Sequence, residues 1–450
     1  MKRKIYDQML NWKKKSASRT ALMIDGARRV GKSYIAEEFG KNEYKSYLLI
    51  DFSRVGDDVK DVFRQELSNL NEFFMILSEY FGVKLYEHES LIIFDEVQRF
   101  PRAREAIKFL VADGRYHYIE TGSLISIKSN VGDIQIPSEE RHVKMYPMDF
   151  EEFLWAVGEE QLMPVISARY SDKKQMGQAL HKKAITLFRQ YMIIGGMPQA
   201  IEVYVNEKDY EEVDGVKRDI LNLYREDIVK YAGKDSIRVQ SVFDEIPSAL
   251  SRHDARFNLS SLGRGSRYRE YEDSFFWLED SMIVNICYNS KDPAFGLKLN
   301  RDRVTMKCYM GDTGLLISHA FDEKGVTENE VYKKILLGKL EANLGMVVEN
   351  VVAQMLVASG RKLYFYKNSD RENADSRMEI DFLIAKDKVS NRHNITPIEV
   401  KSGGRYTLSS IRKFRNKYRE QGDVPTVLHM KDYEEKDGMR FLPVYMTGLL

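Results

Sequence analysis

The sequence predicts an α/β protein that begins with a parallel sheet and ends with a second α/β domain. Residues 21–24 form a short apolar run before a glycine-rich loop, and residues 90–94 form another before two carboxylates. Continuous apolar runs are typical of parallel strands buried on both faces, and their alternation with helix patterns favours a layered α/β fold. Near the C-terminus, residues 379–384 and 396–401 predict two further strands that carry acidic side chains.

Composition limits the class of protein. The chain has 450 residues, of which 43% are hydrophobic and 30% are charged, which excludes collagen-like, disordered and disulfide-stapled classes. Lys and Arg total 69 against 68 Asp and Glu, so any surface for nucleic acid must be a local patch. Cys287 and Cys308 form no CxxC pair, and this favours a reducing cytoplasm. No apolar stretch approaches the ~18 residues of a membrane helix, so we expect no membrane association.

The loop at residues 26–33 has the pattern GxxxxGKS between a predicted strand and a predicted helix. In this context the glycines let backbone N–H groups face phosphates, and the helix N-terminus adds positive charge. We expect Lys32 to reach the β- and γ-phosphates of a nucleotide and Ser33 to ligate Mg²⁺. The alternative is a glycine-rich turn with an exposed lysine. The expected nucleotide contacts are Gly26, Ala27, Arg28, Arg29, Val30, Gly31, Lys32, Ser33 and Tyr34.

Two carboxylates follow the apolar run at 90–94. Ligands of parallel sheets bind at the carboxyl ends of the strands, where Asp95 and Glu96 are expected to lie. We expect Asp95 to hold Mg²⁺ through water and Glu96 to orient and deprotonate the attacking water. The alternative is an acidic strand end that caps the next helix. A further strand at 116–120 leads to Thr121 and Ser123, either of which would sense the γ-phosphate unless the segment is a plain turn.

Several motifs together resemble one protein family. They are GARRVGKS, LIIFDEVQ, ETGS, YPMDFEEFLWA at 146–156 and IGGMPQA at 194–200. The chain resembles the predicted AAA+ ATPases of bacteria and archaea that carry a C-terminal restriction-endonuclease-like domain. This resemblance implies ATP and Mg²⁺ as cofactors. It also implies that Arg141 is an arginine finger or sensor for the γ-phosphate of a neighbouring subunit, and hence a homo-oligomer. The alternative is a solvated surface arginine.

The middle of the chain predicts a winged-helix-like unit. Helix patterns at 242–250 and 266–278 precede strand patterns at 282–288 and 296–299, and the resemblance implies the same arrangement. A basic patch of five arginines would contact DNA phosphates, unless it is a domain interface or a solvated face. Its members are Arg252, Arg256, Arg264, Arg267 and Arg269.

The order of elements after residue 338 resembles the PD-(D/E)XK nuclease core. Alternation along a strand puts Glu399 and Lys401 on one face. We expect Asp381, Glu399 and the carbonyl of Val400 to hold Mg²⁺, with Glu349 from a helix completing the site. Lys401 would position the water or stabilise the pentacoordinate phosphorane. A following helix carries basic residues that would track a DNA backbone, namely Arg412, Lys413, Arg415, Lys417 and Arg419.

These patterns predict three domains: an ATPase core with a helical appendage at 1–205, a winged-helix-like unit at 206–300 and a nuclease-like domain at 301–450. The first functional hypothesis is an ATP-hydrolysing AAA+ enzyme that acts on DNA. The second is a nucleotide-gated switch or scaffold for a protein partner, with a C-terminal domain that does not cut. A third is a Mg²⁺-dependent nuclease regulated by ATP, in which Asp381, Glu399 and Lys401 are catalytic. The charges of this domain could also simply face outward from an amphipathic sheet.

Overall fold

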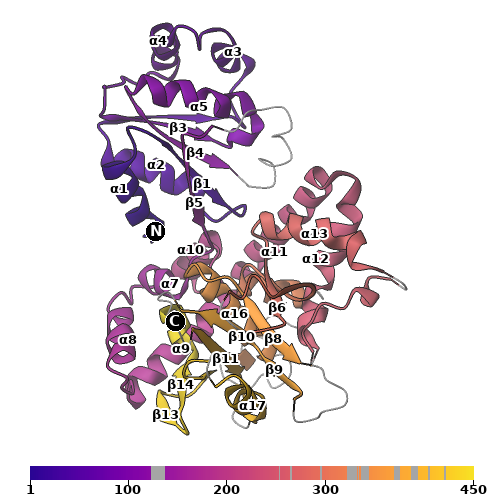
Figure 1. Ribbon diagram of the computed structural model, residues 1–450. Coiled ribbons are helices and arrows are strands. Elements are labelled where there is room, and N and C mark those ends of the chain that lie inside the picture. Colours follow the sequence, from indigo (N-terminus) through magenta and orange to yellow (C-terminus); the bar gives the residue numbers. More distant parts are fainter. Residues whose placement is uncertain are drawn as a thin grey trace. The chain divides into compact units, whose positions relative to one another are not determined.

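The chain folds into two compact units (Figure 1). A computed structural model describes residues 1–122, 137–252, 254–263, 266–293, 296–321, 332, 334–335, 344–368, 376–386, 394–403, 406–419 and 422–450. Unit 1 comprises residues 1–146 and 280–282, and unit 2 comprises residues 147–279 and 283–450. In the described part of the chain, no helix has both the length and the apolar character needed to cross a membrane.

Unit 1 is built on a five-stranded sheet in the order β2-β3-β4-β1-β5. Every neighbouring pair is parallel, which confirms the predicted parallel sheet. Because the strands are parallel, the carboxyl ends of β1, β3 and β4 meet at one edge of the sheet. The strands are β1 (Ala21–Gly26), β2 (Ser46–Asp51), β3 (Ser90–Asp95), β4 (His117–Gly122) and β5 (Glu140–Met145).

Helices and an aromatic core stabilise this sheet. The helices are α1 (Ile5–Lys15), α2 (Lys32–Glu43), α3 (Asp57–Gln65), α4 (Leu70–Phe81), η1 (Val97–Arg99) and α5 (Pro101–Asp113). Phe63 of α3 packs edge-on against Phe73 of α4 at 5.0 Å and against Phe94 of β3 at 5.5 Å between ring centroids. All three rings are fully buried. Burial of such large rings anchors the end of β3, where the acidic residues follow.

Unit 2 begins with a run of helices, and one more helix, the last in the following list, comes after its first two strands. They are α7 (Phe150–Ala156), α8 (Leu162–Ser171), α9 (Gln178–Ile194), α10 (Pro198–Glu207), α11 (Tyr210–Tyr231), η3 (Gly233–Asp235), α12 (Ser236–Ser251), η4 (Leu259–Ser261), α13 (Tyr268–Asp280) and α14 (Thr313–Ala320). Between α9 and α10, Gly195 has a φ of 82° and a ψ of −170°, a conformation open essentially to glycine alone. The chain therefore turns at Gly195, between α9 and α10.

Two mixed sheets complete unit 2. One has the order β7-β6-β8-β9 and the other β10-β11-β12-β14-β13. Their strands are β6 (Val284–Ser290), β7 (Arg301–Met310), β8 (Tyr364–Asn368), β9 (Met378–Ile380), β10 (Phe382–Ala385), β11 (Ile395–Lys401), β12 (Thr426–His429), β13 (Glu434–Lys436) and β14 (Met439–Pro443). Three helices accompany them, namely α16 (Leu344–Ala358), α17 (Ser409–Lys417) and η5 (Val444–Leu449).

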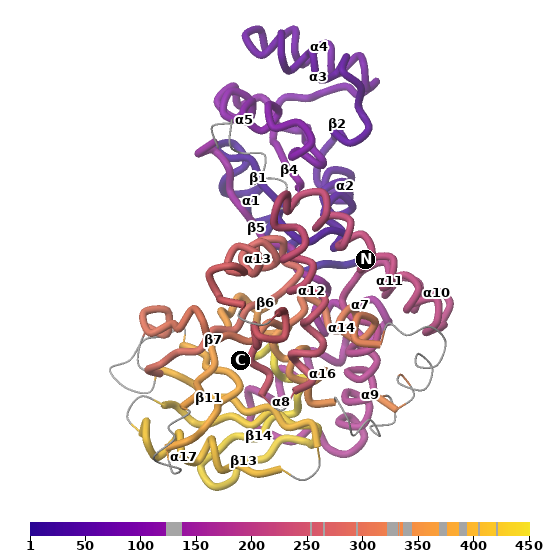
Figure 2. The backbone as a smooth tube through the Cα atoms, turned by 90° about the vertical axis from the view of Figure 1, so that its right-hand side faces the viewer, coloured from indigo at the N-terminus to yellow at the C-terminus, as the bar shows by residue number. Residues whose placement is uncertain are grey.

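The hairpin of the middle region differs from the prediction. Residues 296–299 are not a strand, because Gly296 has a φ of 84° and its carbonyl accepts the N–H of Leu299 at 2.7 Å, which closes a turn. The second strand is β7, which pairs antiparallel with β6 (Figure 2). Strand β6 also pairs in parallel with β8. The predicted domain boundary at 300 therefore falls between two paired strands, and the one at 205 falls inside α10.

Candidate functional site

The loop after β1 wraps around its own lysine. Lys32 begins α2, and its Nζ donates to the carbonyls of Gly26 at 3.0 Å and Ala27 at 2.9 Å. Only 6% of Lys32 is exposed, and this burial lowers its pKa. Gly31 has a left-handed φ of 95°, and a Cβ at Gly26 would lie 2.5 Å from the carbonyl oxygen of Met145. Glycine is thus required at both positions, one for conformation and one for close approach.

Three side chains from three elements meet at the carboxyl edge of the unit 1 sheet. The Oγ of Ser33 donates to Oδ1 of Asp95 at 2.7 Å, and the Oγ1 of Thr121 donates to the same oxygen. Asp95 is the last residue of β3 and is 6% exposed, while Thr121 lies on β4 and is fully buried. A hydroxyl and a carboxylate side by side are the oxygen ligands that Mg²⁺ takes in proteins. The residues present therefore fit the metal that the sequence pattern predicts.

Glu96 follows Asp95 in a strained conformation. Its φ of 53° is left-handed, which is uncommon for a residue with a side chain and clusters at functional sites. Its N–H donates to the Oγ1 of Thr121 at 3.5 Å, and its Oε2 accepts from Nε2 of Gln98 at 2.5 Å. Gln98 was not predicted from the sequence, although it lies two residues downstream and is buried. Gln98 holds the carboxylate that was assigned as the base.

The remaining predicted nucleotide contacts are distributed around the loop. Arg28 is half-buried, whereas Arg29 and Tyr34 are exposed. Val30 is buried, and its carbonyl accepts a hydrogen bond from Nη1 of Arg3 at 2.7 Å, so a residue just before α1 anchors the loop. The predicted sensor Ser123 lies outside the described residues.

A charged cluster that was not predicted from the sequence surrounds Asp25, the residue before the loop. The Nδ1 of His142 contacts Oδ2 of Asp25 at 2.7 Å, and its Nε2 contacts Oε2 of Glu140 at 3.2 Å. Arg104 forms a bidentate pair with Glu140 at 2.8 and 2.6 Å. Burial raises the pKa of neighbouring Glu120 well above its ordinary value. The available signals were Asp25, directly after the apolar run at 21–24, and Glu120, at the end of the strand predicted at 116–120.

A second cluster surrounds Lys307 in unit 2. Its Nζ lies 2.8 Å from Oε1 of Glu349, 3.1 Å from Oε1 of Glu379 and 3.8 Å from Oδ1 of Asp381. Lys307 lies on β7 and its side chain is 1% exposed. Burial lowers its pKa, but the three carboxylates outweigh this and raise the pKa well above its ordinary value. Lys307 and Glu379 were not predicted, because neither belongs to the E-x-K pattern.

The predicted nuclease-like residues lie around this cluster. Asp381 separates β9 from β10, where one continuous strand was expected, and its Oδ2 accepts the N–H of Val400 at 2.8 Å. Burial and the nearby charge of Glu349 raise the pKa of Asp381 to about 7. Glu399 is 2% exposed, and its Oε2 lies 2.8 Å from Nζ of Lys401. Among the described residues, no group of three or more His, Cys, Asp or Glu side chains has the arrangement to hold a metal ion.

Sequence comparison assigns known domain types to three regions. An AAA domain matches residues 18–154, and two domains of unknown function match residues 185–325 (DUF8612) and 344–446 (DUF4143). The first region contains the loop, Asp95 and Glu96. These findings support an AAA-type ATPase domain. No curated protein matches the chain.

One solved structure illustrates how far the likeness extends. It is a Signal Transduction ATPase with Numerous Domains (STAND) protein with a tetratricopeptide repeat sensor from Pyrococcus horikoshii. The match has 10% identity and a TM-score of 0.27, and it covers 80% of this chain and 49% of that protein. The chain thus spans about half the length of that protein, and a likeness at this TM-score supports no conclusion about fold or function.

Arg141 lies on β5, at the outer edge of the AAA domain sheet. It pairs with Leu22, four residues before Gly26, and its Nη1 donates to Oγ of Ser16 at 3.3 Å. Because the loop follows the other end of β1, Arg141 is not part of the nucleotide site of its own subunit. A role toward a neighbouring subunit stays a prediction.

The AAA domain is expected to lose stability as the pH rises from neutral toward 10. Hydrogen bonds with Asp25 and Glu140 raise the pKa of His142 from 6.5 to about 10. A raised pKa in the folded state contributes stability below pH 6.5, and this contribution is lost as the pH rises through about 10. Calorimetric melting of wild type and His142→Asn across this pH range checks the effect. The stability of the variant should fall less steeply with pH than that of wild type. His88→Asn, which changes an exposed histidine of the same unit, should keep the wild-type slope.

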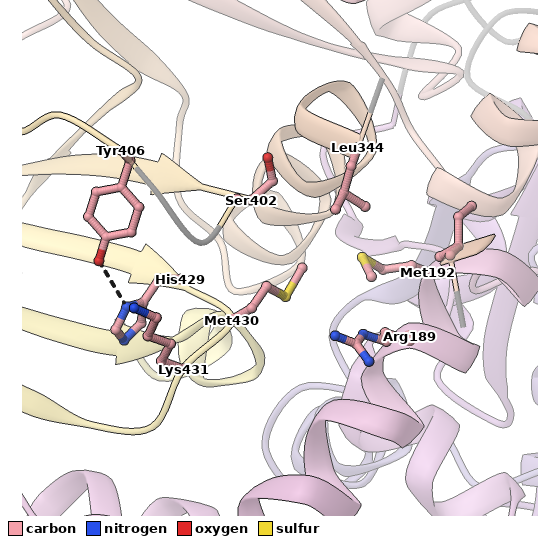
Figure 3. A pocket seen from close by; sticks show the side chains of 10 residues that line it. Arg189, Met192, Leu344, Ser402, Tyr406, His429, Met430 and Lys431 are labelled. Atoms are coloured by element: carbon pink, nitrogen blue, oxygen red, sulfur yellow. Dashed lines mark hydrogen bonds between the residues drawn. The ribbon is translucent and has the colours of Figure 1, made fainter. Parts of the chain in front are cut away.

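A small cavity of about 190 Å³ opens at the carboxyl ends of β11 and β12 (Figure 3). Lys401 is in register with His429 at this edge, and the cavity begins one residue further on, at Ser402. Arg189 of α9 and Lys431 lie on its wall, and Oη of Tyr406 contacts Nδ1 of His429 at 3.3 Å. The cavity thus adjoins the E-x-K strand without containing its acidic residue.

The predicted basic patches are partly neutralised. In the middle region, Arg252 pairs with Glu245 at 2.5 Å and Arg256 pairs with Asp254 at 2.5 Å, whereas Arg264 lies outside the described residues. On α17, Arg412 contacts Asp437 at 3.3 Å. Arg415 and Arg419 line an open groove of about 640 Å³ beside the end of α17. Nη1 of Arg415 also donates to the carbonyl of Asp437 at 2.5 Å.

Proposed function

We propose that this chain binds ATP with Mg²⁺ at residues 26–34 and hydrolyses it. The observation that carries the proposal is the contact of Ser33 and Thr121 with one oxygen of Asp95, at the edge where the loop ends. A hydroxyl from the first turn of α2 and a carboxylate from β3 would hold the metal. The left-handed Gly31 places backbone N–H groups at the start of α2, where phosphates bind.

Each residue of the site has a proposed task. The backbone of Gly26 to Tyr34 would bind the phosphates, and Lys32 would exchange its two carbonyl acceptors for phosphate oxygens. Glu96, oriented by Gln98, would accept a proton from the attacking water. Thr121 would keep the Asp95 carboxylate in place. Bound Mg²⁺ would neutralise charge on the phosphate oxygens.

Replacing Lys32 with Ala is expected to weaken ATP binding on the order of 10- to 100-fold. The reason is that the variant loses charge-assisted hydrogen bonds worth about 1.5 to 3 kcal/mol. Titration calorimetry with a slowly hydrolysed ATP analogue and Mg²⁺ measures the change. The matched control is Lys41→Ala in the same helix, whose Nζ pairs with Glu37 at 3.0 Å on the surface. Wild-type affinity in Lys32→Ala would contradict the proposed site.

DNA is the proposed partner of unit 2. Support comes from the charge of α17 and from the groove lined by Arg415 and Arg419. The succession α16, β8, β9, β10, β11, α17 and β12 also fits the predicted nuclease-like order, and α11 to α13 followed by β6 and β7 fit a helical unit with a hairpin. Binding through phosphates implies ATPase stimulation by duplex DNA that falls steeply with salt.

A nucleotide-gated switch or scaffold for a protein partner is the second candidate. It is favoured by the ion pairs that already engage Arg252, Arg256 and Arg412 within the chain. On this hypothesis turnover is slow and indifferent to DNA. Measuring the ATPase rate with and without DNA at low and high salt separates the two candidates. A homo-oligomer in which Arg141 completes a neighbour's site is compatible with either.

A further inference from the structure

We propose that Lys307 takes the place of a divalent cation in the carboxylate cluster of unit 2, so that this cluster binds no Mg²⁺ and does not cut DNA. The PD-(D/E)XK pattern implies a metal held by Glu349, Asp381 and Glu399. The contacts of these residues in the structure do not fit that metal. The inference is independent of the ATP site, which lies in the AAA domain.

The ammonium group of Lys307 lies among three carboxylates. Three carboxylates, on α16, on β9 and at the end of β9, point at Nζ of Lys307 at 2.8, 3.1 and 3.8 Å. Glu349 and Glu379 lie within hydrogen-bond distance of this ammonium group, and Asp381 lies at ion-pair distance. A cation bound by Glu349 and Asp381 would have to lie against this group, and the two positive charges would repel each other at short range.

The Lys307 side chain cannot easily move away from these carboxylates. Its side chain is 1% exposed, and its backbone lies in register with Cys287 inside the β6–β7 hairpin. Its Nζ also lies 5.3 Å from the ring centre of Phe365 on β8. A buried lysine that left its three partners would leave carboxylates buried without a counter-charge, which is strongly unfavourable.

The carboxylates predicted to hold the metal already have other partners within the chain. The Oε1 of Glu349 accepts the hydroxyl of Tyr309 as well as the ammonium group, and Oδ2 of Asp381 accepts the N–H of Val400 at 2.8 Å. Glu399 pairs with Lys401 at 2.8 Å. A metal bound to these oxygens of Glu349 and Asp381 would therefore have to displace a protein partner from each of them.

Positive and negative charges are nearly balanced across the wider cluster. Lys367 bridges Glu379 and Asp254, each at 2.8 Å, and Asp254 also pairs with Arg256. The cluster thus contains four carboxylates, at positions 349, 379, 381 and 399, and three lysines, at positions 307, 367 and 401. The opposite charges of Asp254 and Arg256 neutralise each other. Nuclease metal sites need an excess of negative charge to attract cations. The cluster has an excess of one at most, spread over four carboxylates.

The test is direct binding of Mn²⁺ by the full chain without nucleotide, measured by the loss of its free electron-spin-resonance signal. An Asp95→Asn background silences the proposed Mg²⁺ ligands of the AAA domain. We expect no binding in this background that depends on Asp381. Lys307→Met should create a site with a Kd on the order of 1 mM or tighter, lost again when Asp381→Asn is added. Lys367→Met is the matched control, because Lys367 contacts Glu379 but not Asp381, and it should create no site.

Two results on Mn²⁺ binding would overturn the proposal. One is Mn²⁺ binding in the Asp95→Asn background that Asp381→Asn abolishes. The other is a folded Lys307→Met variant that gains no Mn²⁺ site. If Lys307→Met does not fold, the comparison of the background with and without Asp381→Asn still decides the question. Plasmid DNA kept with wild type and Mn²⁺ should stay intact, and cleavage that depends on Asp381 would also refute the inference.

Discussion

Replacing Glu96 with Gln is expected to lower the rate of ATP hydrolysis about 100-fold or more while ATP stays bound. The substitution keeps the size of the side chain but removes the carboxylate that would accept a proton from water. The contact with Gln98 and the left-handed backbone at Glu96 both remain possible for Gln. Single-turnover hydrolysis of labelled ATP, together with the amount of nucleotide retained after rapid filtration, measures both effects.

The control for this experiment is a carboxylate in the same unit but away from the carboxyl ends of the strands. Glu89 is exposed and pairs with Lys45 at 3.2 Å, so Glu89→Gln should keep the wild-type rate. Hydrolysis by Glu96→Gln at the wild-type rate would remove Glu96 from the mechanism. Glu96 would then be an acidic residue that only precedes η1, as the alternative interpretation of the sequence allows.

Replacing Asp312 with Ala is expected to destabilise unit 2 by about 3 to 5 kcal/mol. Asp312 is 2% exposed and caps α14 by accepting the N–H of Leu315 at 2.9 Å. Its other oxygen accepts the N–H of Gly196 at 2.5 Å and Nε2 of Gln354 at 3.3 Å. Alanine would leave these donors buried without acceptors. Urea unfolding followed by tryptophan fluorescence measures the loss.

Asp209→Ala is the matched control for Asp312→Ala. Asp209 also caps a helix, accepting the N–H of Glu211 at 2.8 Å at the start of α11, but it is exposed. Its loss should cost about 1 kcal/mol, as for an ordinary helix cap. Equal costs for the two variants would mean that the buried contacts with Gly196 and Gln354 contribute nothing beyond capping.

The residues that meet at the carboxyl edge of the unit 1 sheet could be predicted from the sequence, because they are close together in the chain or lie at strand ends. Gly26, Lys32 and Ser33 lie within one loop, and Asp95 follows an apolar run that could only be a buried strand. Parallel pairing then brings the two strand ends to one edge. Gln98 and the cluster of Asp25 and His142 were missed, since their partners lie on other strands or depend on side-chain direction.

Prediction was less complete in unit 2, where the partners are distant in the chain. Lys307 and Glu349 are separated by 42 positions, and nothing in the E-x-K pattern points to a lysine on an earlier hairpin. The strand predicted at 296–299 was wrong because Gly296 turns the chain. The role of Asp312 was also hidden, because nothing in the sequence around Gly196 indicates the distant carboxylate that accepts its N–H.

The double pairing of β6 determines which fragments of this chain can be produced. A fragment that starts at residue 301 keeps β7 and β8 but loses the strand hydrogen-bonded between them. Each would then present an unsatisfied backbone edge, and such edges pair with other molecules and precipitate. Expression of the C-terminal region by itself should therefore begin before the helices of unit 2, near residue 147, rather than at the sequence-predicted boundary.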